Sequence, residues 1–229
     1  MRWKAGWHVG QELGLFFAVT FGAAWGLWLP AVLAGRGLIP WHPPTAPLVV
    51  LGSAAPSLTA LWLAGRNGSA GALLARLGRW MGSPGWYALA LLGPAAVMLV
   101  AAGLHVLLEG QVPPFPPPGR WPLVFVNLAV VALIGGPLGE ELGWRGWVWP
   151  ILRGHLGPLG SSVVLGLLWA LWHLPLFLLP GTPQAELPFF WYVVQAVPLT
   201  LRLGRVYDGS GGSVLPEAAC CSPCCSTPL

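Results

Sequence analysis

Long apolar segments, each close to the length needed to cross a lipid bilayer, occupy most of this 229-residue chain. A membrane-spanning α-helix needs about 20 consecutive apolar residues. Because backbone amides and carbonyls inside lipid must be hydrogen-bonded internally, such segments fold as helices or as a closed β-barrel. Six segments approach this length, at residues 11–34, 46–64, 86–108, 121–138, 161–179 and 188–203.

The composition and the pattern within these segments favour helices. Charged residues make up 8 % of the chain and hydrophobic residues 55 %, whereas a soluble domain has about 25 % charged residues. The run LALLGPAAVMLVAAGLHVLL lacks the strict alternation of polar and apolar side chains that a barrel strand requires. We therefore predict an all-α fold, a polytopic transmembrane helical bundle of six to seven spans.

Basic residues are distributed unequally between the two sides of such a bundle. With six spans, only Arg36 and Arg120 of the 11 lysines and arginines fall on the side opposite the N-terminus. Cytoplasmic loops of membrane proteins are enriched in basic residues. We therefore predict a multi-pass protein of the cell membrane with a cytoplasmic N-terminus. No basic patch interleaved with aromatic residues indicates nucleic acid as a partner.

Two adjacent glutamates, Glu140 and Glu141, follow the fourth apolar segment in a chain that has seven acidic residues. Ionisable residues within membrane segments are costly and are therefore candidates for a functional site. On a helix, residues four apart share a face, while neighbours diverge by about 100°. This spacing predicts an ion pair between Glu141 and Arg145. It leaves Glu140 facing the bundle interior as a candidate general base.

A histidine, His173, lies deep in the next apolar segment, within GLLWALWHLPLFLLPG. Trp169 lies one turn earlier on the same face, and Pro175 follows two residues later, where it would kink the helix and open space around the histidine. We expect a short loop to join the segments 121–138 and 161–179, so that Glu140 and His173 can meet in one cavity. The structural alternatives are that Glu140 reaches water in the headgroup region and that His173 is a hydrogen-bonded core residue.

These residues resemble two motifs of a known family. EELGWR is similar to the EExxxR motif, and WALWH to the FxxxH motif, of the CAAX protease and bacteriocin-processing (CPBP) intramembrane proteases, which include the type II CAAX prenyl endopeptidases. Trp169 stands where that family has phenylalanine. The flanking sequences GWRGWVWPIL and HLPLF resemble its bacterial members, and the resemblance extends over residues 121–215.

The resemblance implies an intramembrane endopeptidase that acts on a peptide or protein substrate within the lipid bilayer. By family, Glu140 and His173 position and activate a water that attacks a peptide carbonyl, while Glu141, Arg145 and Trp169 support them. Two candidate ligands are fewer than the three of a typical catalytic zinc site. We therefore expect no cofactor, and a divalent metal such as zinc is the alternative.

The C-terminal tail departs from the family. A histidine followed four residues later by asparagine or aspartate is expected after GSVL, but the chain instead ends in PEAACCSPCCSTPL, which holds all four cysteines. Codons that begin one base earlier, from the third base of Ala219, permit Leu-Leu-Leu-Ala-Met-Leu-Leu-His, the kind of helix that the family has here. We predict a single transmembrane domain over residues 1–215 and a frameshifted tail over 216–229, with the last helix and the third catalytic element lost.

Two other functions are compatible with these residues. Without the third motif the chain would be inactive as an enzyme and would act as a non-catalytic membrane binding or immunity protein. Alternatively, Glu140 and His173 would line the proton path of a small proton-linked transporter. Peptide cleavage separates the protease from both alternatives.

Overall fold

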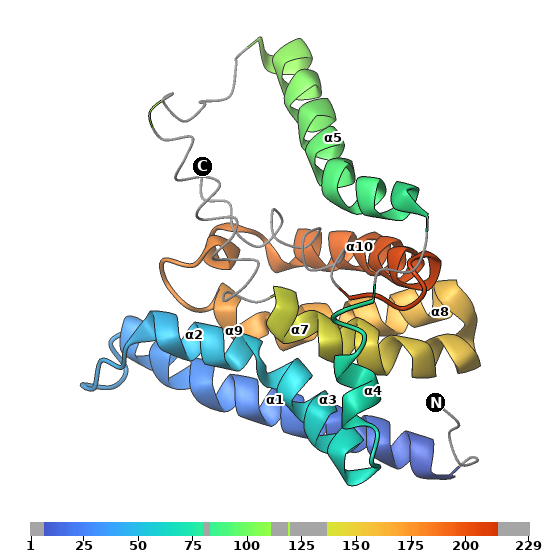
Figure 1. Cartoon of the computed structure of the whole chain (residues 1–229). Helices are drawn as coiled ribbons and strands as arrows, with labels where there is room; N and C mark the ends of the chain where they lie inside the picture. The colour runs from blue at the N-terminus through green and yellow to red at the C-terminus, as the bar shows by residue number, and fades with distance from the viewer. Residues whose placement is uncertain (1–6, 80–82, 111–118, 120–136, 215–229) are drawn as a thin grey trace.

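All regular structure in the described part of the chain is helical (Figure 1). The computed structural model describes residues 7–79, 83–110, 119 and 137–214. The helices are α1 (Trp7–Gly35), α2 (Thr45–Ser53), α3 (Ala55–Arg66), α4 (Ala70–Leu74), α5 (Pro84–Glu109), α7 (Pro137–Gly143), α8 (Trp149–Trp172), α9 (Leu174–Phe177) and α10 (Phe189–Gly209). A π-helical turn, η2 (Trp144–Val148), joins α7 to α8, and a 3₁₀ turn, η3 (Pro183–Glu186), precedes α10. The predicted all-α fold class is confirmed.

Several helices are apolar enough to cross a membrane. In the described ranges, Val9–Gly35 qualifies by length and composition, and so does Gly139–Trp172 when the two arms that meet at Gly157 are counted together. Two bent pairs also qualify, namely α2 with α3 (41°) and the two halves of α5 (40°). The protein is therefore a multi-pass membrane protein with two to four candidate spans among these residues. The predicted span at 121–138 lies almost entirely outside the described residues, and α10, at the predicted span 188–203, is not among the candidates. The cytoplasmic N-terminus stays a prediction.

Gly157 turns α8 back on itself. Its φ of 67° and ψ of 179° are not helical, and a positive φ favours glycine. Glu140 and Trp169, 29 positions apart, would be about 43 Å apart along a straight helix, yet their side chains are hydrogen-bonded at 2.9 Å. The chain must therefore reverse direction between them, as Figure 1 shows.

The stretch around this reversal differs from what the sequence predicted. A loop was expected between the segments 121–138 and 161–179, but most of that stretch is helical, through α7, η2 and the first half of α8. The reason is tertiary packing, because this stretch buries Trp144, Trp147 and Trp149 completely or nearly so. A helix that buries three indole rings is stabilised well beyond its intrinsic propensity.

Tryptophans and close helix crossings build the core. Trp147 stacks on Phe16 of α1, with ring centroids 5.0 Å apart, and Trp144 meets the same ring edge-on at 5.4 Å. A Cβ atom at Gly143 would lie 2.4 Å from the carbonyl carbon of Pro56, so α7 crosses α3 in direct backbone contact. Small residues allow such approaches between membrane helices. These contacts fix α7, which carries the two glutamates, against α3.

Helix α5 projects from the rest of the bundle (Figure 1). Its first turns contact α10, where Ala90 packs with Leu203 and Val206. Beyond them it exposes large apolar side chains, including Leu107 and Leu108, which are 81 % and 82 % exposed. Such a surface suits contact with lipid.

Candidate active site

The helical hairpin brings the two sequence motifs together in the protein interior. Helix α7 carries both glutamates, and the second half of α8 returns to it with Trp169 and His173 at its end. All five predicted site residues are buried, with exposed fractions of 4 % for Glu140, 0 % for Glu141, 0 % for Arg145, 1 % for Trp169 and 2 % for His173. The motifs therefore meet away from bulk water.

The indole of Trp169 holds the carboxylate of Glu140. Its Nε1–H donates to Glu140 Oε2 at 2.9 Å, and both groups are buried. A hydrogen bond from a fixed donor to a carboxylate limits the rotation of the acid and is stronger than a bond between neutral groups. Phenylalanine, which the family has at this position, could not donate this bond. Glu140 therefore faces the histidine-bearing helix, as the spacing predicted for a side chain in the bundle interior.

The backbone carbonyl of Trp169 orients His173. It lies 2.9 Å from His173 Nδ1, and because a carbonyl oxygen only accepts, Nδ1 carries the proton. Nε2 then holds the lone pair of the neutral ring and is the atom able to accept a proton. The rings of Trp169 and Trp172 pack edge-to-face with the imidazole, and their centroids lie 5.0 Å and 4.6 Å, respectively, from the centroid of His173. These contacts fix both the tautomer and the plane of the ring.

Pro175 ends the helix beside this histidine. Since proline has no N–H, it cannot bond to the carbonyl one turn earlier. Helix α8 ends at Trp172, and the short helix α9 begins at Leu174, so His173 lies at the junction. The break that Pro175 was predicted to cause is thus present.

Glu141 and Arg145 form the predicted ion pair. Arg145 Nη1 lies 3.0 Å from Glu141 Oε1, and neither side chain is exposed. The guanidinium carbon also lies 5.3 Å from the centroid of the Trp169 ring, a distance at which cation–π attraction operates. Arg145 lies in the π-helical turn η2, and π-turns inside helices are frequent at functional sites. Trp169 thus contacts Glu140, Arg145 and His173 at once.

Two donor atoms and one acceptor atom of this ion pair are left unsatisfied by the described residues. Glu141 Oε2, Arg145 Nε and Arg145 Nη2 are buried and have no hydrogen-bond partner among the residues that the structure describes. Unsatisfied buried polar atoms cost free energy, so their presence points to a functional role. The two free arginine donors lie beside the ring that binds Glu140, so they can serve a polar group of a substrate.

Tyr192 is a neighbour of the site that the sequence motifs did not predict. Tyr192 of α10 packs against His173 at 5.4 Å and against Trp169 at 6.0 Å between ring centroids. It belongs to no motif, and an aromatic residue in an apolar segment carries no signal of its position relative to a histidine 19 residues earlier. Only the packing of α10 on α8 brings them together.

The donor set available for a metal is small in the described part of the chain. No group of three or more His, Cys, Asp or Glu side chains is placed there to hold an ion. The tail over 216–229, in which the third motif was expected, lies outside the described residues. The predicted domain boundary at 215 lies outside them as well.

Comparisons with known proteins agree with the motifs. Residues 120–220 match the family model described as type II CAAX prenyl endopeptidase Rce1-like. The CAAX prenyl protease 2 of Methanococcus maripaludis is 31 % identical over 115 residues, which are 48 % of this chain and 42 % of that protein. The chain therefore spans less than half the length of this relative. Both motifs lie inside the matched region and are in contact in the structure, so residues 120–220 of the chain are similar to the CAAX protease family in sequence and in the placement of its motifs.

Proposed function

We propose that this chain is an intramembrane endopeptidase that hydrolyses a peptide bond with a water activated by Glu140 and His173. The observation that carries the proposal is the bridge through Trp169. Its indole N–H binds the carboxylate of Glu140, and its backbone carbonyl binds the imidazole of His173. One buried residue therefore orients both the carboxylate of Glu140 on α7 and the imidazole of His173 at the end of α8.

In the proposed reaction Glu140 removes a proton from a bound water, and the water oxygen attacks the carbonyl carbon of the scissile peptide bond. His173 binds the same water through Nε2, because its Nδ1–H is committed to the carbonyl of Trp169. The tetrahedral intermediate then collapses: its C–N bond breaks, and the protonated carboxyl of Glu140 gives the proton to the leaving amine. The substrate is a peptide or protein segment that enters the membrane.

Arg145 has a separate role in this proposal. It is a buried cation beside Trp169, and two of its donors have no partner among the described residues. A fixed positive group in a site of low dielectric constant stabilises the oxyanion that forms when the carbonyl is attacked. Glu141 holds the guanidinium in place through their ion pair.

We further propose that the reaction needs no metal. Among the described residues of the site, Glu140 and His173 are two potential ligands, whereas a typical catalytic zinc has three protein ligands. The guanidinium of Arg145 lies 5.3 Å from the ring of Trp169, which also contacts both candidate ligands. A buried cation that contacts the same indole ring disfavours a divalent ion beside it, because like charges repel.

The test is cleavage of quenched fluorescent peptides by the protein reconstituted in lipid vesicles. Two proteins are assayed: the chain with the sequence given, and a form whose reading frame is restored from Ala219 onward. The second form is included because the family's third motif is expected after that residue. We expect cleavage that a metal chelator leaves unchanged. Loss of cleavage on chelation, restored by zinc, would contradict the metal-free mechanism. Proton-coupled uptake without any cleavage would favour the transporter instead.

Replacing Trp169 by phenylalanine tests the bridge. The aromatic ring stays, but the bond to Glu140 is lost, and a hydrogen bond to a charged group contributes about 1.5–3 kcal/mol. We expect kcat to fall about tenfold or more. KM should stay nearly unchanged, because the replacement affects the orientation of the Glu140 carboxylate and not the binding of substrate.

Trp172→Phe is the matched control for this variant. Trp172 also packs on His173, at 4.6 Å, but its indole N–H has no hydrogen-bond partner among the described residues. We expect this variant to keep its kcat. Equal losses in both variants would mean that ring packing, and not the bond to Glu140, explains the effect.

A further inference from the structure

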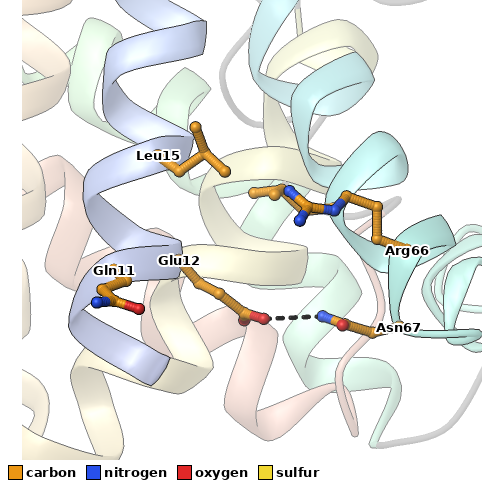
Figure 2. A pocket seen from close by; sticks show the side chains of 6 residues that line it. Gln11, Glu12, Leu15, Arg66 and Asn67 are labelled. Carbon is orange, nitrogen blue, oxygen red and sulfur yellow. Dashed lines mark hydrogen bonds between the residues drawn. The ribbon is translucent and has the colours of Figure 1, made fainter. Parts of the chain in front are cut away.

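A pocket at one end of the bundle lies apart from the candidate active site. It opens between α1 and α3, encloses about 210 Å³ and shares no residue with that site. Its lining, shown in Figure 2, consists of Gln11, Glu12, Leu15, Leu63, Arg66 and Asn67. Four of these six side chains are polar, which is unusual for a gap between two candidate spans.

The pocket presents one acidic and one basic group that form no direct ion pair with each other. Glu12 Oε1 accepts a hydrogen bond from Asn67 Nδ2 at 2.9 Å, whereas Glu12 Oε2 is buried without a hydrogen-bond partner in the described part of the chain. Arg66 extends from α3 toward α1 (Figure 2), and no salt bridge joins these two described residues. A carboxylate oxygen without a donor is costly, so a ligand that supplies a cation would be stabilised.

The pocket lies where the two helices leave the apolar layer. The first candidate span begins at Val9, and the bent pair of α2 and α3 ends at Arg66, so Glu12 and Arg66 lie at the same end of both spans. The half-exposed Trp62 lies one turn before Arg66, whose guanidinium is 5.2 Å from its ring centroid. Tryptophans are enriched at the level of lipid headgroups. These contacts assign the pocket to that level.

The apolar residues lie on the membrane side of the charged ones. Leu15 follows Glu12 by three residues into α1, and Leu63 precedes Arg66 by three residues in α3. Both leucines therefore lie one turn deeper in the bilayer than the charges. The pocket is amphipathic along the membrane normal, as a lipid is.

We propose that this pocket binds the zwitterionic headgroup of an aminophospholipid. The ammonium group would bind Glu12 Oε2, the phosphate would bind the guanidinium of Arg66, and the glycerol end of the acyl chains would lie on Leu15 and Leu63. A purely anionic headgroup would bring no cation to the carboxylate and would be repelled by it. The proposal does not depend on the proposed reaction, and its test uses no measurement of cleavage.

The test is a lipid titration of the delipidated protein followed by native mass spectrometry. Phosphatidylethanolamine and phosphatidylglycerol with the same acyl chains are compared. A hydrogen bond to a charged group contributes about 1.5–3 kcal/mol, so we expect the intact chain to prefer the ethanolamine lipid about tenfold or more. Glu12→Gln should abolish this preference, and Arg66→Gln should weaken the binding of both lipids.

Two exposed residues outside the pocket provide matched controls. Glu186→Gln and Arg205→Gln remove the same charges from exposed positions on η3 and α10 and should leave the lipid preference intact. A pocket variant counts as folded when its thermal unfolding midpoint lies within the range measured for the two control variants. Equal binding of the two lipids by the intact chain, or an unchanged preference in folded Glu12→Gln, overturns the proposal. So does displacement of the lipid by an equal concentration of soluble glycerophosphoethanolamine, which would point to a free headgroup compound.

Discussion

Glutamine in place of Glu140 is expected to lower kcat for peptide cleavage by about 10²–10⁴-fold, the usual contribution of a general base. Glutamine has nearly the same shape, and its side-chain oxygen can still accept the indole N–H of Trp169, which now binds Glu140 Oε2. It cannot take a proton from water. The measurement is single-turnover cleavage by the reconstituted protein, together with its thermal unfolding midpoint, which should change little.

The matched control is Glu109→Gln in α5. This carboxylate is 65 % exposed and pairs only with His105 on its own helix, among the contacts described for it. We expect its cleavage rate to equal that of the unchanged protein. If Glu140→Gln retained full activity while remaining folded, the carboxylate would not be the base, and the proposed mechanism would have to be abandoned.

Glutamine in place of Glu141 is expected to act on stability instead. The ion pair with Arg145 is entirely buried, and removal of one partner of a buried pair costs about 3–5 kcal/mol, because the other charge is left uncompensated. We therefore expect the free energy of unfolding to fall by this amount. Denaturant titration in detergent micelles, followed by tryptophan fluorescence, measures the loss.

A double replacement separates the loss of the pair from the stranded charge. In Glu141→Met with Arg145→Met, no charge remains in the interior, and such apolar replacements are often neutral or stabilising. The double variant should recover most of the stability that Glu141→Gln loses, although we expect it to cleave slowly without the guanidinium. A double variant that is less stable than the single one would show that the pair itself stabilises the fold.

Features that lie within one helical segment could be predicted from the spacing of residues in the sequence. The length of the apolar runs and their lack of polar alternation predicted helices, because the backbone in lipid must be hydrogen-bonded internally. Helices α1 and α5 cover the predicted spans 11–34 and 86–108. The i, i+4 spacing predicted the pair of Glu141 with Arg145, which is present. Over four residues the geometry of a helix leaves little freedom, so these predictions needed no tertiary information.

Tertiary structure alone decided which of these segments meet. The reversal at Gly157, in a stretch expected to be a loop, brings Glu140 onto Trp169 from 29 positions away. The pairing of Glu12 with Asn67, 55 positions apart, depends in the same way on how α1 lies against α3. Sequence spacing fixes no distance once the chain turns, because one residue outside the helical region redirects everything after it. The motifs could thus be found in the sequence, but their contact follows from one glycine and the packing around it.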